Sequence, residues 1–94
     1  MSDTLTTSLE ISMYPLQDEY LTKIEDFLFH IHKVEGIKVQ TNVMSTQLFG
    51  PLDLVFDTVK EAIKQVYSDG TQCPFAIKVL NTDISAMEVK DFKK

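Results

Sequence analysis

The residues that could do chemistry are few, and the most unusual group is a run of uncharged polar side chains. The segment from Asn42 to Gln47 reads Asn-Val-Met-Ser-Thr-Gln, so most of its side chains carry a neutral hydrogen-bonding group. Asn, Ser and Thr often cap backbone groups at turns, which is one interpretation of the run. The other is a cluster that binds a polar heterocycle, because amides and hydroxyls both donate and accept hydrogen bonds. The sequence leaves both interpretations open.

The histidines and the cysteine do not form a catalytic or metal-binding pattern. His30 and His32 are two residues apart, so on a helix they point in widely different directions and cannot share a metal ion. Cys73 has no histidine at a spacing typical of a catalytic pair, and we interpret it as a small buried apolar residue. The acids form no evident general acid and base pair, and zinc spacings and phosphate-binding glycine loops are missing. We expect no catalytic residue, no metal and no cofactor.

The charge balance narrows the class of partner. The 94-residue chain has 9 basic and 14 acidic residues, a net charge of -5, and every basic residue is Lys. Nucleic acids and anionic membranes require a positive field, and Arg is the usual residue for phosphate recognition. We therefore expect a neutral or cationic small molecule and no nucleic-acid or membrane partner. A single cysteine, with no apolar run of signal-peptide or membrane-span length, favours a cytoplasmic protein.

Apolar periodicity predicts the elements that must position these residues. Alternation over 8–14, 37–42 and 75–80 is typical of strands, and a further short strand is expected at 46–49. Spacings of three and four predict one helix over 18–34 and another from Pro51 to a stop at Asp69-Gly70. Asp18 and Glu19 are expected in the first turn of the first helix, where the helix dipole favours acids. Residues 1–7 and 84–94 are expected to be peripheral tails of a single domain, 1–94.

This β-α-β-β-α-β order predicts an α+β, ferredoxin-like sandwich. Its four-stranded antiparallel sheet should have the first and third strands in the centre and both helices on one face. The uncovered face should bind a ligand or a second chain, because it combines polar groups with a few large side chains. Its expected side chains are Glu10, Ser12, Tyr14, Lys38, Gln40, Asn42, Lys78 and Leu80.

Two motifs resemble those of a known family. Ile11-Ser12-Met13-Tyr14-Pro15-Leu16 is similar to the S-x-Y-P-L strand end of the YkoF-type thiamine/hydroxymethylpyrimidine-binding family, and residues 42–50 resemble its N-x-M-S-T-x-x-x-G segment. The resemblance covers about residues 8–83. It implies a ferredoxin-like domain that binds thiamine or its pyrimidine precursor without catalysis. Some members carry two such domains in one chain, so this single domain is expected to form a homodimer or homotetramer.

The expected ligand-binding residues are uncharged polar or aromatic side chains and one acid: Glu10, Ser12, Tyr14, Asn42, Ser45, Thr46 and Phe49. The resemblance implies five of them, namely Ser12 and Tyr14 in the first motif and Asn42, Ser45 and Thr46 in the second. Glu10 suits the thiazolium cation, and Phe49 or Tyr14 could stack on a ring, although Tyr14 could equally cover the end of the sheet. We expect the neutral polar groups, including Ser12, Asn42 and Thr46, to share the uncovered face.

Two other function classes stay open on sequence grounds. A small dimeric ferredoxin-like enzyme, of the cofactorless monooxygenase or isomerase type, can work with a lone His or Asn. A regulatory domain that pairs through its uncovered sheet is the other. A thermal response to thiamine would separate the binding protein from both.

Overall fold

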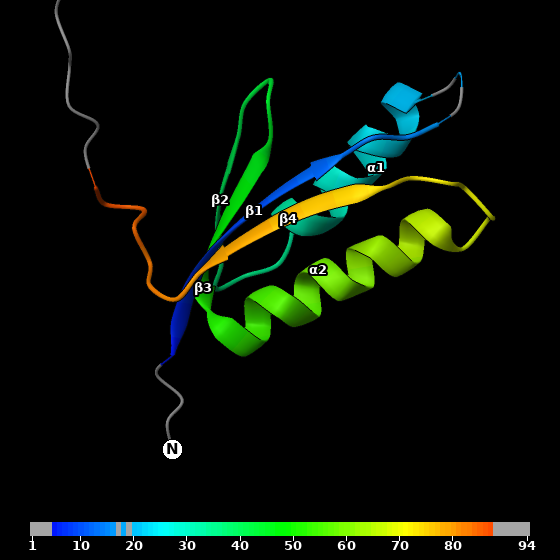
Figure 1. Cartoon of the computed structure of the whole chain (residues 1–94). Coiled ribbons are helices and arrows are strands. Elements are labelled where there is room, and N and C mark those ends of the chain that lie inside the picture. The colour runs from blue at the N-terminus through cyan, green and yellow to red at the C-terminus, as the bar shows by residue number, and fades with distance from the viewer. Residues whose placement is uncertain (1–4, 17, 19, 88–94) are drawn as a thin grey trace, which may run out of the picture.

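The protein is an α+β sandwich, shown as a computed structural model that describes residues 5–16, 18 and 20–87 (Figure 1). The elements are β1 (Thr6–Met13), α1 (Tyr20–His32), β2 (Lys38–Thr41), β3 (Thr46–Pro51), α2 (Leu52–Tyr67) and β4 (Phe75–Leu80). The strands form one antiparallel sheet in the order β2-β3-β1-β4. The predicted ferredoxin-like fold, with the first and third strands in the centre, is confirmed.

Both helices pack on the same face of the sheet, as predicted (Figure 1). On β1, Leu9 and Ile11 point toward the helices and are almost completely buried. Their neighbours in the core are Leu48 from β3, two side chains from α1 and four from α2: Phe27, Ile31, Val55, Val59, Ala62 and Val66. Burial of these apolar surfaces is the main force that holds the helices on the sheet.

The helix ends differ from the prediction by a few residues. Helix α1 begins at Tyr20, so Asp18 precedes the helix and does not lie in its first turn, and Glu19 lies outside the described residues. Helix α2 has Pro51 as its N-cap and Asp53 in its first turn. It ends at Tyr67, before the predicted stop at Asp69-Gly70. Exposed ends of helices are poorly defined by periodicity, because few apolar contacts fix them.

The inner ends of both predicted tails are hydrogen-bonded to the sheet or belong to it. Thr7 belongs to β1 and is fully buried, and its Oγ1 donates to the Leu80 carbonyl over 2.7 Å. After β4 the chain is pinned to β1 by Ser8, whose Oγ donates to the Thr82 carbonyl (2.7 Å) and accepts from the Ile84 N–H (2.9 Å). The expectation of a peripheral tail is therefore wrong at 6–7, which belong to β1, whereas Ile84 lies outside the strands and is held by Ser8. Residues 1–4 and 88–94 lie outside the described residues.

The pairing between β1 and β3 stops early. At that point β1 is still paired with β4, and β3 is still paired with β2. Their register runs from Thr6–Pro51 to Ile11–Thr46, whereas β1 stays paired with β4 as far as Met13–Phe75. The β2–β3 hairpin also continues past Thr46, to a hydrogen bond from the Asn42 N–H to the Ser45 carbonyl (3.0 Å). Figure 1 shows the hairpin diverging from β1 toward its tip. We call the gap between residues 12–13 and residues 41–46 the strand split.

Candidate functional site

A hollow of about 320 Å³ occupies the strand split. Its two sides are the end of β1 and the end of the β2–β3 hairpin, and its floor is the apolar face of α1, with Ile24, Phe27 and Leu28. Four of the seven predicted ligand-binding residues line this hollow: Ser12, Asn42, Ser45 and Thr46. The structure thus brings together the polar residues of both sequence motifs.

Asn42 holds the turn at the tip of the hairpin. Its Oδ1 accepts hydrogen bonds from the backbone N–H groups of Met44 (2.8 Å) and Ser45 (3.1 Å). Two-residue hairpin connections usually rely on positive φ angles, but among the described residues only glycines have a positive φ. The hydrogen bonds to the side chain of Asn42 therefore stabilise the connection Val43-Met44, which does not adopt the usual positive φ angles. The Oδ1 of Asn42 thus caps the turn, as one of the two interpretations of this segment expects. Its Nδ2 group is still a possible donor at the edge of the hollow.

Ser12 and Ser45 connect the two sides of the strand split. The Oγ of Ser12 donates to the Met44 carbonyl over 3.3 Å, from β1 to the hairpin. The Oγ of Ser45 donates to Glu10 Oε2 (2.7 Å) and accepts from Gln47 Nε2 (2.8 Å). These bonds fix the hydroxyls at the rim of the hollow.

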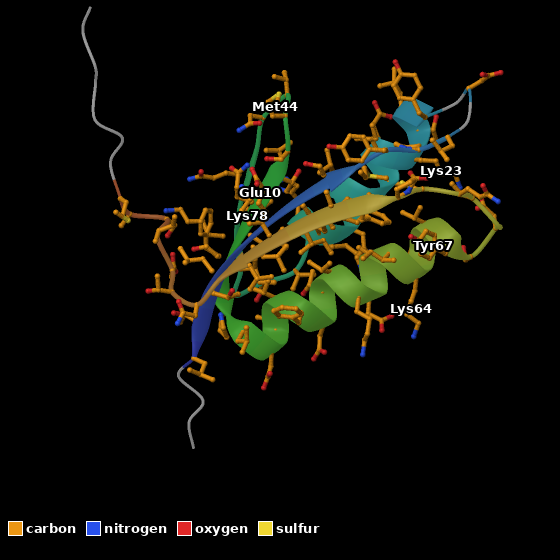
Figure 2. All side chains as sticks on the ribbon, in the orientation of Figure 1. Glu10, Lys23, Met44, Lys64, Tyr67 and Lys78 are labelled. Atoms are coloured by element: carbon orange, nitrogen blue, oxygen red, sulfur yellow. The ribbon has the colours of Figure 1, made fainter. Side chains whose placement is uncertain are left out.

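Glu10 lies on the uncovered face beside Lys78, with 3.5 Å between its Oε1 and Lys78 Nζ (Figure 2). The hydrogen bond from Ser45 and the charge of Lys78 lower the pKa of the Glu10 carboxyl. A carboxyl group with a lowered pKa stays ionised at neutral pH, so Glu10 is a fixed negative charge and a weak base.

Thr46 faces the helices, so the expectation that Ser12, Asn42 and Thr46 share the uncovered face is wrong. Thr46 pairs with Ile11, whose side chain is in the core, and directly paired residues project to the same side of a sheet. Successive strand residues alternate, so Ser45 and Thr46 point to opposite faces. The strand split brings both faces to one hollow, and Thr46 therefore lines it with Ser12.

The hydroxyl of Thr46 is almost completely buried and belongs to a short chain of polar groups. Its Oγ1 lies 3.2 Å from Thr41 Oγ1, which lies 3.4 Å from His32 Nε2 at the end of α1. The chain leads from the hollow to the surface of the helix layer. His32 is exposed, and it contacts the hollow through Thr41, which is one of the lining residues.

The backbone of β1 also faces the strand split at Met13. The N–H of Tyr14 donates to the Pro74 carbonyl over 3.0 Å, toward the β4 side. Backbone groups of successive strand residues point to opposite edges, so the N–H and C=O of Met13 point toward β3, beyond the last β1–β3 pair. Sequence motifs could not indicate Met13, because any residue presents the same backbone groups; only the strand register reveals it.

The other three predicted ligand-binding residues lie outside this hollow. Tyr14 follows β1 and is about half exposed, which fits the alternative that it covers the end of the sheet. Glu10 and Phe49 line a second hollow, of about 220 Å³, on the uncovered face. The seven predicted residues therefore do not all line one hollow.

The metal-binding types of side chain and the cysteine give no competing site in the part of the chain that the structure describes. Groups of three His, Cys, Asp or Glu side chains able to hold a metal do not occur there. Cys73 is buried, and burial raises the pKa of its thiol, which makes it a poor nucleophile. None of the described helices combines the length and apolar character needed to cross a membrane.

Several solved structures share the fold. A hypothetical protein from Methanocaldococcus jannascii is 27% identical, with a TM-score of 0.69, and the match covers 94% of this chain and 84% of that one. A domain of unknown function from Bacillus cereus is 20% identical, with a TM-score of 0.72 and coverage of 90% and 88%. A Thermotoga maritima protein provisionally assigned to thiamine biosynthesis/salvage is 16% identical, with a TM-score of 0.70 and coverage of 90% and 89%.

Among curated proteins, no sequence matches this chain significantly. The profile that describes the YKOF-related family matches residues 6–85, a stretch that includes both motifs and the whole strand split. The chain therefore belongs to the YKOF-related family.

Proposed function

We propose that this chain is a non-catalytic binding protein for thiamine or its hydroxymethylpyrimidine moiety, with the pyrimidine ring seated in the strand split. The observation that carries the proposal is a hollow lined by uncharged donors and acceptors from two strands and floored by apolar side chains of α1. Membership of the YKOF-related family supports this ligand class, as does the provisional assignment of the Thermotoga relative.

An aminopyrimidine has apolar faces and a polar edge, and the hollow offers a counterpart to each. The ring faces can pack against Phe27 and Leu28. The edge carries a ring nitrogen that accepts and an adjacent amine that donates. A strand edge offers the complementary pair, an N–H and a C=O from one residue, and Met13 presents that pair in the strand split. The ligand would thus form with Met13 the two hydrogen bonds that a residue of β3 would form if the β1–β3 pairing continued.

The hydroxyls of Ser12 and Thr46 complete the polar contacts from opposite faces of the sheet. A hydroxyl can donate to a second ring nitrogen or accept from the amine. A buried polar group left without its partner costs about 1–3 kcal/mol, so analogues without the ring nitrogens or the amine would bind weakly. Selectivity for the heterocycle therefore follows from hydrogen bonding and not from charge.

The titratable groups favour binding over catalysis. Glu10 is held as an anion by Ser45 and Lys78, and the pKa of buried Cys73 is raised. An enzyme of the cofactorless type would need a base beside the reacting atoms, and His32 does not line the hollow but lies behind the hydroxyl of Thr41. We therefore propose no catalytic role for these residues. Association of two or four chains remains part of the proposal, with the edge strands β2 and β4 as available surfaces.

Thermal unfolding with three probes tests the proposal: thiamine, hydroxymethylpyrimidine and choline as a simple cation. A ligand at about 100 times its Kd adds roughly 2.7 kcal/mol of stability, a rise of about 10 °C or more for a domain of this size. We expect that rise with thiamine and hydroxymethylpyrimidine only. The variant Ser12→Ala should weaken the response, while Ser85→Ala, far along the chain from the hollow, should keep it. Equal responses to choline, or no response to either vitamin compound, would refute the proposal.

A further inference from the structure

We infer a second binding site, on the uncovered face of the sheet, for a small organic cation with one apolar ring. The site is the 220 Å³ hollow that contains Phe49, and we call it the open-face hollow. It shares no lining residue with the strand split. Among the described residues, the two hollows are linked only by Ser45, which lines the strand split and donates to Glu10 of the open-face hollow.

The apolar end of the open-face hollow is built by the return of the chain after β4. Ser8 pins the backbone at Thr82 and Ile84, and this places Ile84 at the hollow with Phe49 and Leu80. Phe49 is only 7% exposed, although it lies on the face that the helices leave uncovered. The segment after β4 therefore adds an apolar wall to an otherwise flat sheet face, against which an apolar ring can pack.

The other end of the open-face hollow is polar and carries opposite charges. It is formed by Glu10, Gln47 and Lys78 (Figure 2 labels Glu10 and Lys78 side by side). The Glu10 carboxylate is held by Ser45, which is itself hydrogen-bonded to Gln47. The Lys78 side chain is 83% exposed and has one partner 3.5 Å away, so it can turn into solvent. The fixed charge of the hollow is negative.

A fixed carboxylate next to an aromatic side chain recognises a cation joined to an apolar ring. The ring would contact Phe49, Leu80 and Ile84, and the cation would take the place of Lys78 at Glu10. Aromatic faces attract cations, which adds to the effect of the carboxylate. The net charge of -5 also favours this sign over an anion.

Calorimetric titration with three ligands of the same ring tests the inference: phenethylamine, 2-phenylethanol and phenylacetate. We expect the amine to bind about three- to fivefold more tightly than the alcohol, because the ion pair with Glu10 is partly exposed, and phenylacetate to bind most weakly. Glu10→Gln should reduce the affinity for the amine to that for the alcohol, and Lys78→Ala should preserve or raise the affinity for the amine. Ile84→Ala should weaken both ligands.

Tighter binding of phenylacetate, or amine binding that Glu10→Gln leaves unchanged, would overturn the inference. A second contradicting result would be a dimer that Leu80→Asp dissociates, if neither the dimer nor the dissociated chain binds the amine. The occupant of this face would then be a second copy of the chain. The variant Thr46→Val provides the matched control, because it alters the strand split alone and should leave amine binding intact. Loss of vitamin binding in that variant would not affect this result.

Discussion

At the scale of single residues, Thr46 is the side chain on which the proposed recognition depends most. It is 5% exposed, lines the strand split, and has one protein hydroxyl, that of Thr41, within hydrogen-bond distance. A hydroxyl can make more than one hydrogen bond, so Thr46 can still serve a ligand. Its burial makes any such bond strong, because water competes poorly for it.

We predict that Thr46→Val lowers the affinity for hydroxymethylpyrimidine about tenfold, the loss of one hydrogen bond of roughly 1.4 kcal/mol. Valine keeps the shape of threonine and removes only the hydroxyl. Calorimetric titration measures the change. Thr58→Val is the control, because Thr58 is equally buried but lies on α2, away from the hollow. Equal losses in the two variants would show that the effect is structural.

Asp69 is the residue for which a pH dependence of stability is expected. Its carboxylate pairs with Lys23 and so ties the segment after α2 to α1. The hydrogen bonds from Lys23 and Thr71 lower the pKa of Asp69 from 3.8 to about 2. A group with a lowered pKa in the folded state stabilises the fold above its ordinary pKa. That contribution disappears as the pH falls from 3.8 toward 2.

We predict that Asp69→Asn lowers the free energy of unfolding at pH 7 and flattens its fall between pH 3.8 and pH 2. Urea unfolding at a series of pH values measures both effects. Asp57→Asn is the control, because Asp57 lies 4.0 Å from Lys60 on the exposed side of α2 and the pair is solvated. A profile for Asp69→Asn that parallels the wild type down to pH 2 would contradict the role of the pair.

At the scale of elements, the β2–β3 hairpin creates the hollow of the strand split by separating from β1 after the Ile11–Thr46 pair. Strand β1 continues beside β4 for two residues past its last pair with β3, so the two central strands enclose a wedge of space. Helix α1 closes the wedge from behind. The hairpin tip depends on one side chain, Asn42, while Val43 and Met44 are almost fully exposed. Position and stability of the tip are therefore sensitive to Asn42.

We predict that Asn42→Ala speeds hydrogen exchange at the amides of Met44 and Ser45, because the acceptor for both N–H groups is lost. Asn42→Asp keeps an acceptor oxygen, so exchange should remain slow while the Nδ2 donor disappears. Exchange measured by NMR separates the two variants. If Asn42→Asp also loses vitamin affinity, the side chain acts on both the turn and the ligand. Fast exchange in both variants would show that the turn needs the amide itself.

Much of this arrangement could be predicted from the sequence, and the limits are physical. The strand β1 and the helix α2 could be predicted from their buried residues, such as Leu9 and Ile11 in β1, because alternation and helical spacing follow directly from burial. The opposite orientations of Ser45 and Thr46 also follow from alternation, but the convergence of both on one hollow does not. It depends on where the β1–β3 register stops, and pairing between distant segments leaves no local pattern. The proximity of Ile84 to the hollow that contains Phe49 could not be predicted for the same reason.

The second motif can be explained by packing as well as by binding. Gly50, its last residue, lies so close to the α1–β2 connection that a Cβ there would be 3.0 Å from the Gly36 carbonyl oxygen. Asn42 at its first position holds the turn, and Ser45 and Thr46 line the strand split. The motif therefore combines positions that hold the backbone with positions that line the hollow, which the sequence alone could not separate.

At the scale of the whole molecule, the net charge favours cationic over anionic ligands. Every basic residue is a lysine and the net charge is -5, so the protein has no guanidinium fork for a phosphate. The lysine nearest to Glu10 is already paired with it. A vitamin with a thiazolium cation suits this field, and its phosphorylated forms do not.

We predict that thiamine phosphate and thiamine diphosphate bind no more tightly than thiamine, because each added phosphate meets a negative protein. Competition calorimetry at two salt concentrations measures the order of affinities. Added salt should narrow any difference, since it screens the repulsion. A clear preference for the diphosphate would contradict this description of the electrostatic field.

The most direct test of the central claim is an NMR titration of the isotopically labelled protein with hydroxymethylpyrimidine. If the pyrimidine pairs with the free edge of β1 in the strand split, the amide signals that move most will be those of Met13 and of residues 42–46. Signals of the open-face hollow, including Phe49 and Ile84, should stay in place. Absence of any shift at millimolar ligand, or shifts centred elsewhere on the molecule, would contradict the account.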